Sequence, residues 1–224
     1  MNLKANCFIY IFCILLFPVI GIKAQETIKR PVNPQPFSVV FKTNPLPILW
    51  GPVYFTSEYR IVNEFVVGPN QSSQIGISFL GKSPIFTLID NAMSQNGTLK
   101  IMVRGIRVQL SHRFYLNRKD TYAPEGFYLG PLFSYSTARF TNKHLNIYNV
   151  YIRSTHINLN MIGGYQLILP GDFVIDMFSG FGYKENTWEE HTPPTITPIN
   201  TDDFGPSYNS NFKIILGFNI GKAF

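Results

Sequence analysis

The chain has 224 residues, a formal net charge of +6, 45% hydrophobic and 15% aromatic residues, and two cysteines. Both cysteines, Cys7 and Cys13, lie in a segment that we expect to be removed, which excludes thiol catalysis and thiolate metal sites from the mature chain. The basic residues are dispersed rather than gathered in a stripe, which argues against nucleic-acid binding.

Residues 1–24 have the layout of a secretory signal peptide. Lys4 precedes an apolar block at 8–22, and Ala24-Gln25 offers a cleavage site. The block is shorter than the ~20 apolar residues that a spanning helix needs. The cysteines lie within the signal and not at its end, so no lipid anchor is expected. Removing the signal takes away Lys4 and Lys23, which leaves a net charge of +4 on about 200 residues, a length that suits one domain.

Residues 25–36 hold three prolines and are predicted to form a short periplasmic leader. From residue 37 onward, apolar and polar residues alternate in eight segments. Since successive side chains of a strand point to opposite faces, each segment is predicted to be a β-strand with one apolar face. In chain order the predicted strands cover residues 37–44, 51–61, 65–82, 101–116, 126–140, 156–167, 172–184 and 212–224.

The connections between these strands divide into two groups. Pro45-Leu46-Pro47 turns the chain after the first strand, and Val62-Asn63-Glu64 is predicted to be the tight turn before the third. Gly68-Pro69-Asn70 then interrupts the third strand as a bulge or late start. With a periplasmic amino terminus, connections 62–64, 117–125 and 169–171 are periplasmic. The longer connections, at 83–99, 141–150 and 185–208, are external, which is the asymmetry of outer-membrane barrels.

The last strand, residues 212–224, places its apolar residues on one parity that ends at the terminal Phe224. An apolar strand face of this kind belongs in an outer membrane, and Phe224 is predicted to lie in the interfacial girdle and to act as an assembly signal. No segment after residue 24 is long and apolar enough to be a spanning helix, so a membrane protein must be a closed barrel. The predicted fold at 37–224 is therefore all-β, an eight-stranded antiparallel up-and-down transmembrane β-barrel, closed by pairing of the last strand with the first near Phe37.

A soluble lipocalin-like barrel also has eight antiparallel strands, with its apolar parity facing inward around a ligand. In this chain the polar parity is rich in Gly, Ser, Ala and Asn and carries only scattered charges. That composition suits a narrow lumen better than a solvated exterior, so the membrane barrel is the preferred interpretation.

Several motifs resemble those of small eight-stranded outer-membrane barrels. They are the signal end Ala24-Gln25, Gly51-Pro52 leading into Ser57-Glu58-Tyr59-Arg60, Gly163-Gly164-Tyr165 before a short turn, and the ending at 216–224. Together they resemble the OmpA/OmpX type and, more closely, uncharacterised barrels of Bacteroidota. The resemblance implies an outer-membrane location, lipid contact and insertion by the barrel-assembly machinery, but it implies little about function.

Charged and imidazole side chains fall on the inward parity of the predicted strands: Lys42, Glu58, Arg60, Arg107, Arg113, His156, Asp176, Lys184 and Lys213. An eight-stranded barrel is just wide enough to be filled by side chains, and charges removed from water must pair. The primary hypothesis is thus an ion-paired, plugged lumen, with a structural or interaction role for the three external loops toward an extracellular ligand or protein. Basic groups outnumber Glu58 and Asp176, so the alternative is a small passive pore with a weak anion preference.

Two tryptophans, Trp50 and Trp188, fall at external strand ends, where amphipathic rings favour the headgroup level. A second alternative function is a lipid-modifying enzyme, whose deacylase type needs a Ser-His-acid set on one face. His112 follows Ser111 and His156 follows Thr155, but neighbouring residues point to opposite faces, and neither histidine has a His-x-Ser spacing. Enzymatic activity is therefore not predicted.

The last external loop is acidic, which raises the possibility of a cation site. Its acidic and imidazole residues are Glu185, Glu189, Glu190, His191, Asp202 and Asp203. Their spacing fits no known ligand loop. No metal or cofactor is predicted.

Overall fold

The computed structural model describes residues 37–49, 56–93, 101–116, 122–142, 149–200 and 210–224. The chain divides into two compact units, Met1–Gln35 and Pro36–Phe224, and the described residues belong to the second. The predicted signal peptide and leader, Trp50, and parts of the predicted loops lie outside the described residues.

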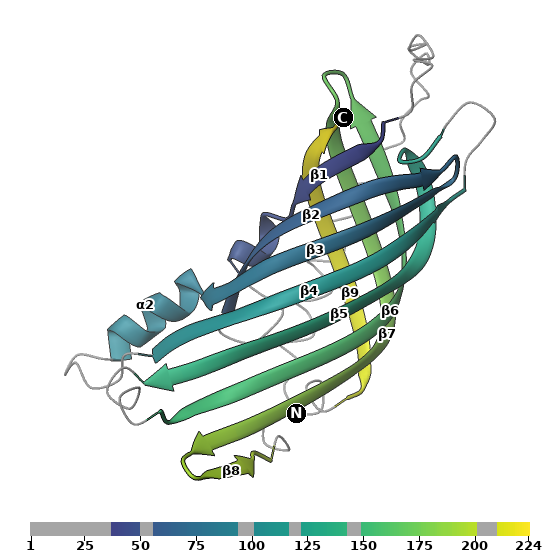
Figure 1. Ribbon diagram of the computed structural model, residues 1–224. Helices are drawn as coiled ribbons and strands as arrows, with labels where there is room; N and C mark the ends of the chain where they lie inside the picture. The colour runs from purple at the N-terminus through teal and green to yellow at the C-terminus, as the bar shows by residue number, and fades with distance from the viewer. Residues whose placement is uncertain (1–36, 50–55, 94–100, 117–121, 143–148, 201–209) are drawn as a thin grey trace, which may run out of the picture. The chain divides into compact units, whose positions relative to one another are not determined.

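The described strands form one antiparallel sheet that closes on itself (Figure 1). Neighbouring strands pair in the order β6-β5-β4-β3-β2-β1-β9-β7, and β6 also pairs with β7. The eight barrel strands are β1 (Val39–Thr43), β2 (Thr56–Gly68), β3 (Gln71–Lys82), β4 (Ile101–Tyr115), β5 (Gly126–Asn142), β6 (Tyr151–Leu169), β7 (Phe173–Thr192) and β9 (Phe212–Ala223). The predicted eight-stranded antiparallel barrel is confirmed.

The last strand pairs with the first, as predicted. The register joins Val40 to Ala223 and Thr43 to Ile220. Two backbone hydrogen bonds of 2.8 Å extend this seam to the terminal residue: the Ser38 amide donates to the Phe224 carbonyl, and the Phe224 amide donates to the Val39 carbonyl. The chain end is therefore part of the closure of the barrel.

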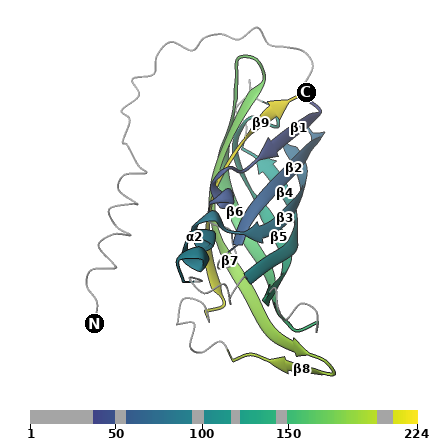
Figure 2. The same cartoon turned by 90° about the vertical axis from the view of Figure 1, so that its left-hand side faces the viewer.

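The two ends of the barrel differ. Figure 2 shows the β6–β7 hairpin and the end of β9 at one end, which we call the turn end, and β8 (Thr195–Pro198) at the other, which we call the loop end. The loop end also carries the short 3₁₀ helix η1 (Leu46–Ile48) and the helix α2 (Pro84–Met93). No helix within the described ranges has both the length and the apolar character that a membrane crossing requires.

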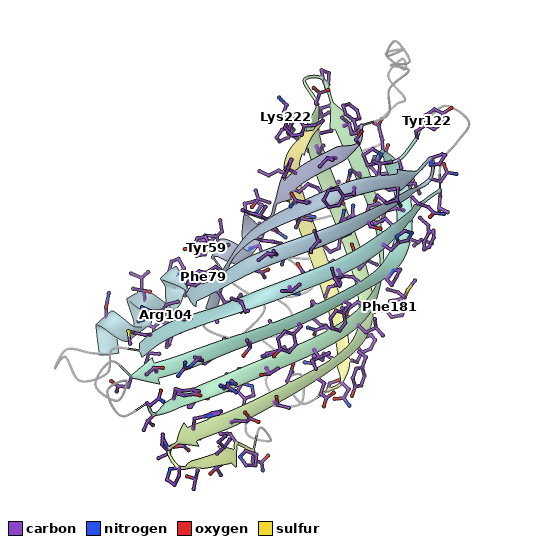
Figure 3. All side chains as sticks on the ribbon, in the orientation of Figure 1. Tyr59, Phe79, Arg104, Tyr122, Phe181 and Lys222 are labelled. Carbon is purple, nitrogen blue, oxygen red and sulfur yellow. The ribbon has the colours of Figure 1, made fainter. Side chains whose placement is uncertain are left out.

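The two faces of the barrel wall have opposite chemistry. Outward positions hold large apolar side chains that are exposed, such as Ile61 (65%), Ile77 (61%) and Leu216 (73%). Figure 3 shows outward-facing rings along the wall, among them Phe181. Most inward positions hold polar and charged side chains that are buried, and smaller groups of buried apolar side chains, such as Leu132 with Ile162, lie among them. This is the reverse of the lipocalin-like alternative, in which the apolar residues would face inward.

The predicted turn at Val62-Asn63-Glu64 is wrong. β2 continues through these residues to Gly68, and the chain reverses at Pro69-Asn70, since Gly68 pairs with Gln71. Proline cannot donate to the strand ladder and asparagine is a common turn residue, so the real turn has the stronger turn chemistry. The consequence is that Glu64 lies inside the barrel and is fully buried.

The three predicted loops contain more regular structure than expected. Region 83–99 holds α2, whose first turn is marked by the Thr87 amide donating to the Ser83 carbonyl at 2.8 Å. Region 185–208 is partly strand, because β7 runs on to Thr192 and pairs with β8. Region 141–150 is shortened on its amino-terminal side, because β5 runs to Asn142. β5, β6 and β7 therefore extend far toward the loop end.

Candidate functional site in the barrel interior

All nine predicted interior residues lie on the inward face of their strands. Seven are buried and two, Lys184 and Lys213, are half-buried. Most of them belong to two groups at different heights. We call them the turn-end cluster, built around Lys42, Glu64, Arg113 and Asp176, and the loop-end cluster, built around Glu58, Arg60, Arg107 and Lys213.

In the turn-end cluster, Lys42 of β1 bridges the two carboxylates. Its Nζ donates to Glu64 Oε2 at 2.6 Å and to Asp176 Oδ2 at 3.1 Å. The same ammonium group donates to Gln166 Oε1 at 2.8 Å. All three of its donor positions are therefore used, so the ammonium is fully satisfied without water.

Arg113 of β4 binds the same partners from the opposite side. Its Nη2 donates to Asp176 Oδ2 at 2.8 Å and its Nη1 to Gln166 Oε1 at 3.0 Å. The guanidinium also lies over the ring of Tyr128, with Cζ 3.9 Å from the ring centroid. Arg113 is the largest of the fully buried side chains of the described barrel. Two cations and two carboxylates thus balance in the cluster.

Neutral groups supply the remaining hydrogen bonds to the carboxylates. Tyr115 Oη donates to Glu64 Oε1 at 2.7 Å, and Tyr128 Oη donates to Asp176 Oδ1 at 2.6 Å. Ser72 Oγ also donates to Glu64, and Asn219 Nδ2 donates to Asp176 Oδ2 at 2.9 Å.

The turn-end cluster takes at least one side chain from every barrel strand. In strand order these are Lys42, Glu64, Ser72, Arg113 and Tyr115, Tyr128, Gln166, Asp176 and Asn219. A network that reaches all eight strands fills the cross-section of the barrel. A cavity of only about 20 Å³, lined in part by Arg60, Arg113 and Asn219, lies beside it, which is room for about one water molecule.

The loop-end cluster has a surplus of positive charge. Glu58 accepts from Arg60 Nε at 2.7 Å, from Arg107 Nη1 at 3.0 Å and from Ser78 Oγ at 2.6 Å. Lys213 Nζ donates to the side-chain oxygen of Asn158 at 2.8 Å. Two guanidinium groups thus share one carboxylate, and Lys213 adds a third basic side chain to the cluster.

A cavity of about 220 Å³ adjoins the loop-end cluster and is lined in part by Arg60, Arg107, Asn160 and Lys213. Two buried polar atoms of this lining, Arg107 Nε and Asn160 Oδ1, have no hydrogen-bond partner among the described residues. A cationic lining with an unpaired guanidinium nitrogen favours an anion or water in this cavity over a cation.

Histidines and serines do come together at two places, which the sequence reasoning missed. Ser154 Oγ lies 2.8 Å from His156 Nε2 inside the barrel, because residues two apart share a strand face. Ser73 Oγ lies 2.9 Å from His112 Nδ1, since the two residues are paired across β3 and β4. The prediction that neither histidine shares a strand face with a nearby serine is thus wrong for His156.

Within the described ranges, neither pair shows the carboxylate that would complete a hydrolase triad. His156 has the amide of Asn186 as a further side-chain partner, whereas a Ser-His-acid triad needs a carboxylate there. The outward-facing pair at His112 packs against the ring of Phe114, with centroids 4.7 Å apart.

Trp188 and Phe224, both expected at the membrane interface, lie on different sides of the barrel wall or at different ends of it. Trp188 lies on the same face of β7 as Asp176 and stacks on Phe140, with ring centroids 5.4 Å apart and an interplanar angle of 26°. Its contact is thus on the inner side of the wall. Phe224 is exposed at the turn end and packs edge-on against Phe41, at 5.7 Å between centroids.

The acidic last loop gives one ion pair in the described residues, between His191 Nε2 and Glu189 Oε2 at 3.4 Å. Asp202 and Asp203 lie outside the described residues. Within the ranges that the structure covers, no three His, Cys, Asp or Glu side chains gather as a metal site would require.

Six members of the turn-end cluster were absent from the predicted set: Glu64, Ser72, Tyr115, Tyr128, Gln166 and Asn219. Glu64 was hidden by the wrong turn. Gln166 and Asn219 were placed on the polar parity, but only charged and imidazole residues were selected from it. Tyr128 stands between outward-facing Phe127 and Leu129, so the alternation alone indicates that its hydroxyl points inward.

No protein-family model, curated protein sequence or solved structure matches this chain. Its function therefore has to be inferred from the geometry of the barrel.

Proposed function

We propose that this chain is an outer-membrane β-barrel of the small OmpA/OmpX-like kind, with a lumen closed by ion-paired side chains. Its role is structural or interactive, through the connections at the loop end, which meet an extracellular ligand or protein. The observation that carries the proposal is the turn-end cluster, whose hydrogen bonds join side chains of all eight strands across the interior.

The exposed apolar face supports the membrane location. A belt of outward-facing Ile, Leu, Phe and Tyr would be costly in water, whereas in lipid it is the expected surface of a closed barrel. The ring of strands closes through β1, which pairs with β2 at residues 62–65 and with β9 at residues 220–223, and a closed ring is the form of sheet that lipid admits.

The orientation follows from the ends of the barrel. β1 begins and β9 finishes at the turn end, so this end faces the periplasm and the loop end faces outward. Export by the signal peptide at 1–24 and insertion by the barrel-assembly machinery, with Phe224 as the assembly signal, complete the proposal.

A planar lipid bilayer tests the plugged interior. Purified barrel added to the bilayer is expected to insert without raising the conductance above that of lipid alone, because the turn-end cluster leaves no continuous water path. A porin inserted in the same chamber serves as the positive control. Discrete single-channel openings from this chain would contradict the plug.

The second candidate is a passive pore, and the loop-end cavity is the observation that favours it. Its lining has Arg60, Arg107 and Lys213 against the single carboxylate of Glu58. If the bilayer experiment shows openings, the surplus of basic side chains predicts an anion preference. Under a salt gradient, the reversal potential would then lie toward the equilibrium potential of the anion.

A further inference from the structure

Three arginines form a row across the outward face of the barrel near the loop end. Arg104 of β4 is directly opposite Arg139 of β5, and Arg139 is directly opposite Arg153 of β6. On the next strand, Glu189 of β7 is opposite Arg153. We call the three arginines the arginine row. Neighbouring strands are about 4.8 Å apart, so three positive charges stand within about 10 Å.

Like charges directly opposite each other destabilise a sheet, so this arrangement needs a compensating partner. The protein itself supplies mainly neutral contacts. Arg139 Cζ lies 3.7 Å from the centroid of the Tyr151 ring, and Arg153 Nη2 donates to Tyr151 Oη at 3.0 Å. Glu189 makes its ion pair with His191. Tyr151 thus holds the guanidinium groups of Arg139 and Arg153, and among the described residues no carboxylate forms an ion pair with any of the three arginines.

The arginine row borders a hollow of about 680 Å³ on the outer surface. Its lining combines the three arginines and Glu189 with the threonines Thr137, Thr155 and Thr187. The remaining lining residues are apolar or aromatic: Phe79, Gly105, Ile106 and Tyr135. Figure 3 shows Arg104 and Phe79 on the same part of the wall, toward the loop end.

The row also marks a change in the outward face. Next to it lies the cross-strand row with Ile106, Thr137, Thr155 and Thr187. Beyond that row the outward residues of β4, β5 and β6 are apolar, with Tyr135 and Ile157 paired across β5 and β6, while Glu185 of β7 is opposite Ile157. The arginines therefore stand where the apolar belt ends and charged residues begin. In a bilayer this is the height of the lipid headgroups.

We propose that the arginine row binds the phosphates of a glycolipid headgroup in the outer leaflet, of the diphosphorylated lipid A type. Guanidinium groups bind phosphate oxygens bidentately, threonine hydroxyls supply further donors, and the neighbouring apolar belt accommodates acyl chains. Three guanidiniums across three strands suit a headgroup with more than one phosphate. This inference rests on the proposed outer-membrane location and on the loop end facing outward.

Native mass spectrometry of the barrel released from detergent micelles tests the proposal. The micelles carry diphosphorylated lipid A in the first arm, the same lipid without its phosphates in the second and phosphatidylglycerol in the third. In the fourth arm the micelles carry no added lipid and the buffer contains inorganic phosphate. The wild-type barrel is expected to retain one diphosphorylated lipid A molecule and to retain the dephosphorylated lipid at least about tenfold less. Equal retention of both forms, of phosphatidylglycerol, or of inorganic phosphate alone would overturn the assignment.

The matched variants are the triple substitution Arg104→Gln, Arg139→Gln, Arg153→Gln and the single substitution Lys222→Gln. Lys222 is an exposed cation at the turn end, far along the wall from the row. The triple variant should lose retention by at least about tenfold and Lys222→Gln should keep it. Retention by the triple variant would contradict the proposal.

Two measurements separate this inference from the proposed function and from misfolding. Each variant is first inserted into phosphatidylcholine vesicles and checked for a heat-dependent change in gel migration. If the wild type does not insert, the membrane location fails. If the wild type and the variants all insert but the wild type does not retain lipid A, only the arginine-row inference fails. Should the triple variant not fold, Arg139→Gln alone removes the central guanidinium and is expected to give reduced retention.

Discussion

Asp176→Asn is expected to lower the free energy of unfolding of the barrel by about 3–5 kcal/mol. The substitution keeps the size of the side chain but removes its charge. It leaves Lys42 and Arg113, both buried, with Glu64 as the one remaining carboxylate of the cluster. An uncompensated cation in a site without water is the physical reason for the loss. The measurement is the urea concentration at half-unfolding in lipid vesicles, followed by tryptophan fluorescence.

Asp172→Asn is the matched control for this prediction. Asp172 lies in the turn that precedes β7 and is exposed there, so its charge is hydrated. Its substitution should change the free energy of unfolding by less than about 0.5 kcal/mol. If both variants unfold at the urea concentration of the wild type, the turn-end cluster does not stabilise the barrel in the way proposed.

Ile77→Arg is expected to cost about 2–4 kcal/mol in lipid vesicles. Ile77 is outward-facing in the middle of β3 and lies between Ile61 and Val108 on the neighbouring strands. A guanidinium there would replace an apolar side chain in the hydrocarbon region. The same change on a water-exposed surface is nearly neutral, so this substitution separates a lipid-facing belt from a solvated one.

Gln71→Arg on the same strand and face is the control. Gln71 is exposed at the turn end of β3, next to the Pro69-Asn70 turn, where the interface would lie. The expected cost is about 0–1 kcal/mol, because the penalty for a cation falls toward the interface. Equal urea midpoints for Ile77→Arg and Gln71→Arg would contradict a lipid-facing belt.

The sequence predicted the fold well because alternation over many residues is a strong signal. In β6, for example, Ile157, Leu159 and Met161 face outward and His156, Asn158 and Asn160 face inward, as the pattern indicated. The closure of β9 onto β1 was also predicted, since an even number of antiparallel strands brings both ends of the ring to the same side.

Several of the predicted strand boundaries were wrong. Val62-Asn63-Glu64 resembled a turn by composition, although its alternation continues that of β2 and the proline at 69 marks the real reversal. The end of β7 was missed because residues 185–192, apart from Trp188, are polar on both faces of the strand. In α2, proline at the first helical position is a favourable start that the loop assignment overlooked.

The pairing within the interior could not be predicted, although the membership of the inward face could. Parity shows that Arg113 and Asp176 both point inward, but it does not show their relative height. Their contact at 2.8 Å depends on the stagger of the strands around the barrel. Contacts across the lumen, such as Lys42 to Asp176 at a separation of 134 residues, depend on the same stagger.

The most direct test of the account is cell fractionation of the chain expressed with its amino-terminal segment in a Gram-negative host. The protein is expected to remain in the outer-membrane fraction until detergent extracts it. The extracted protein should also migrate differently on a denaturing gel before and after boiling, as a folded barrel does. Recovery of the folded protein in the soluble fraction without detergent would contradict the account.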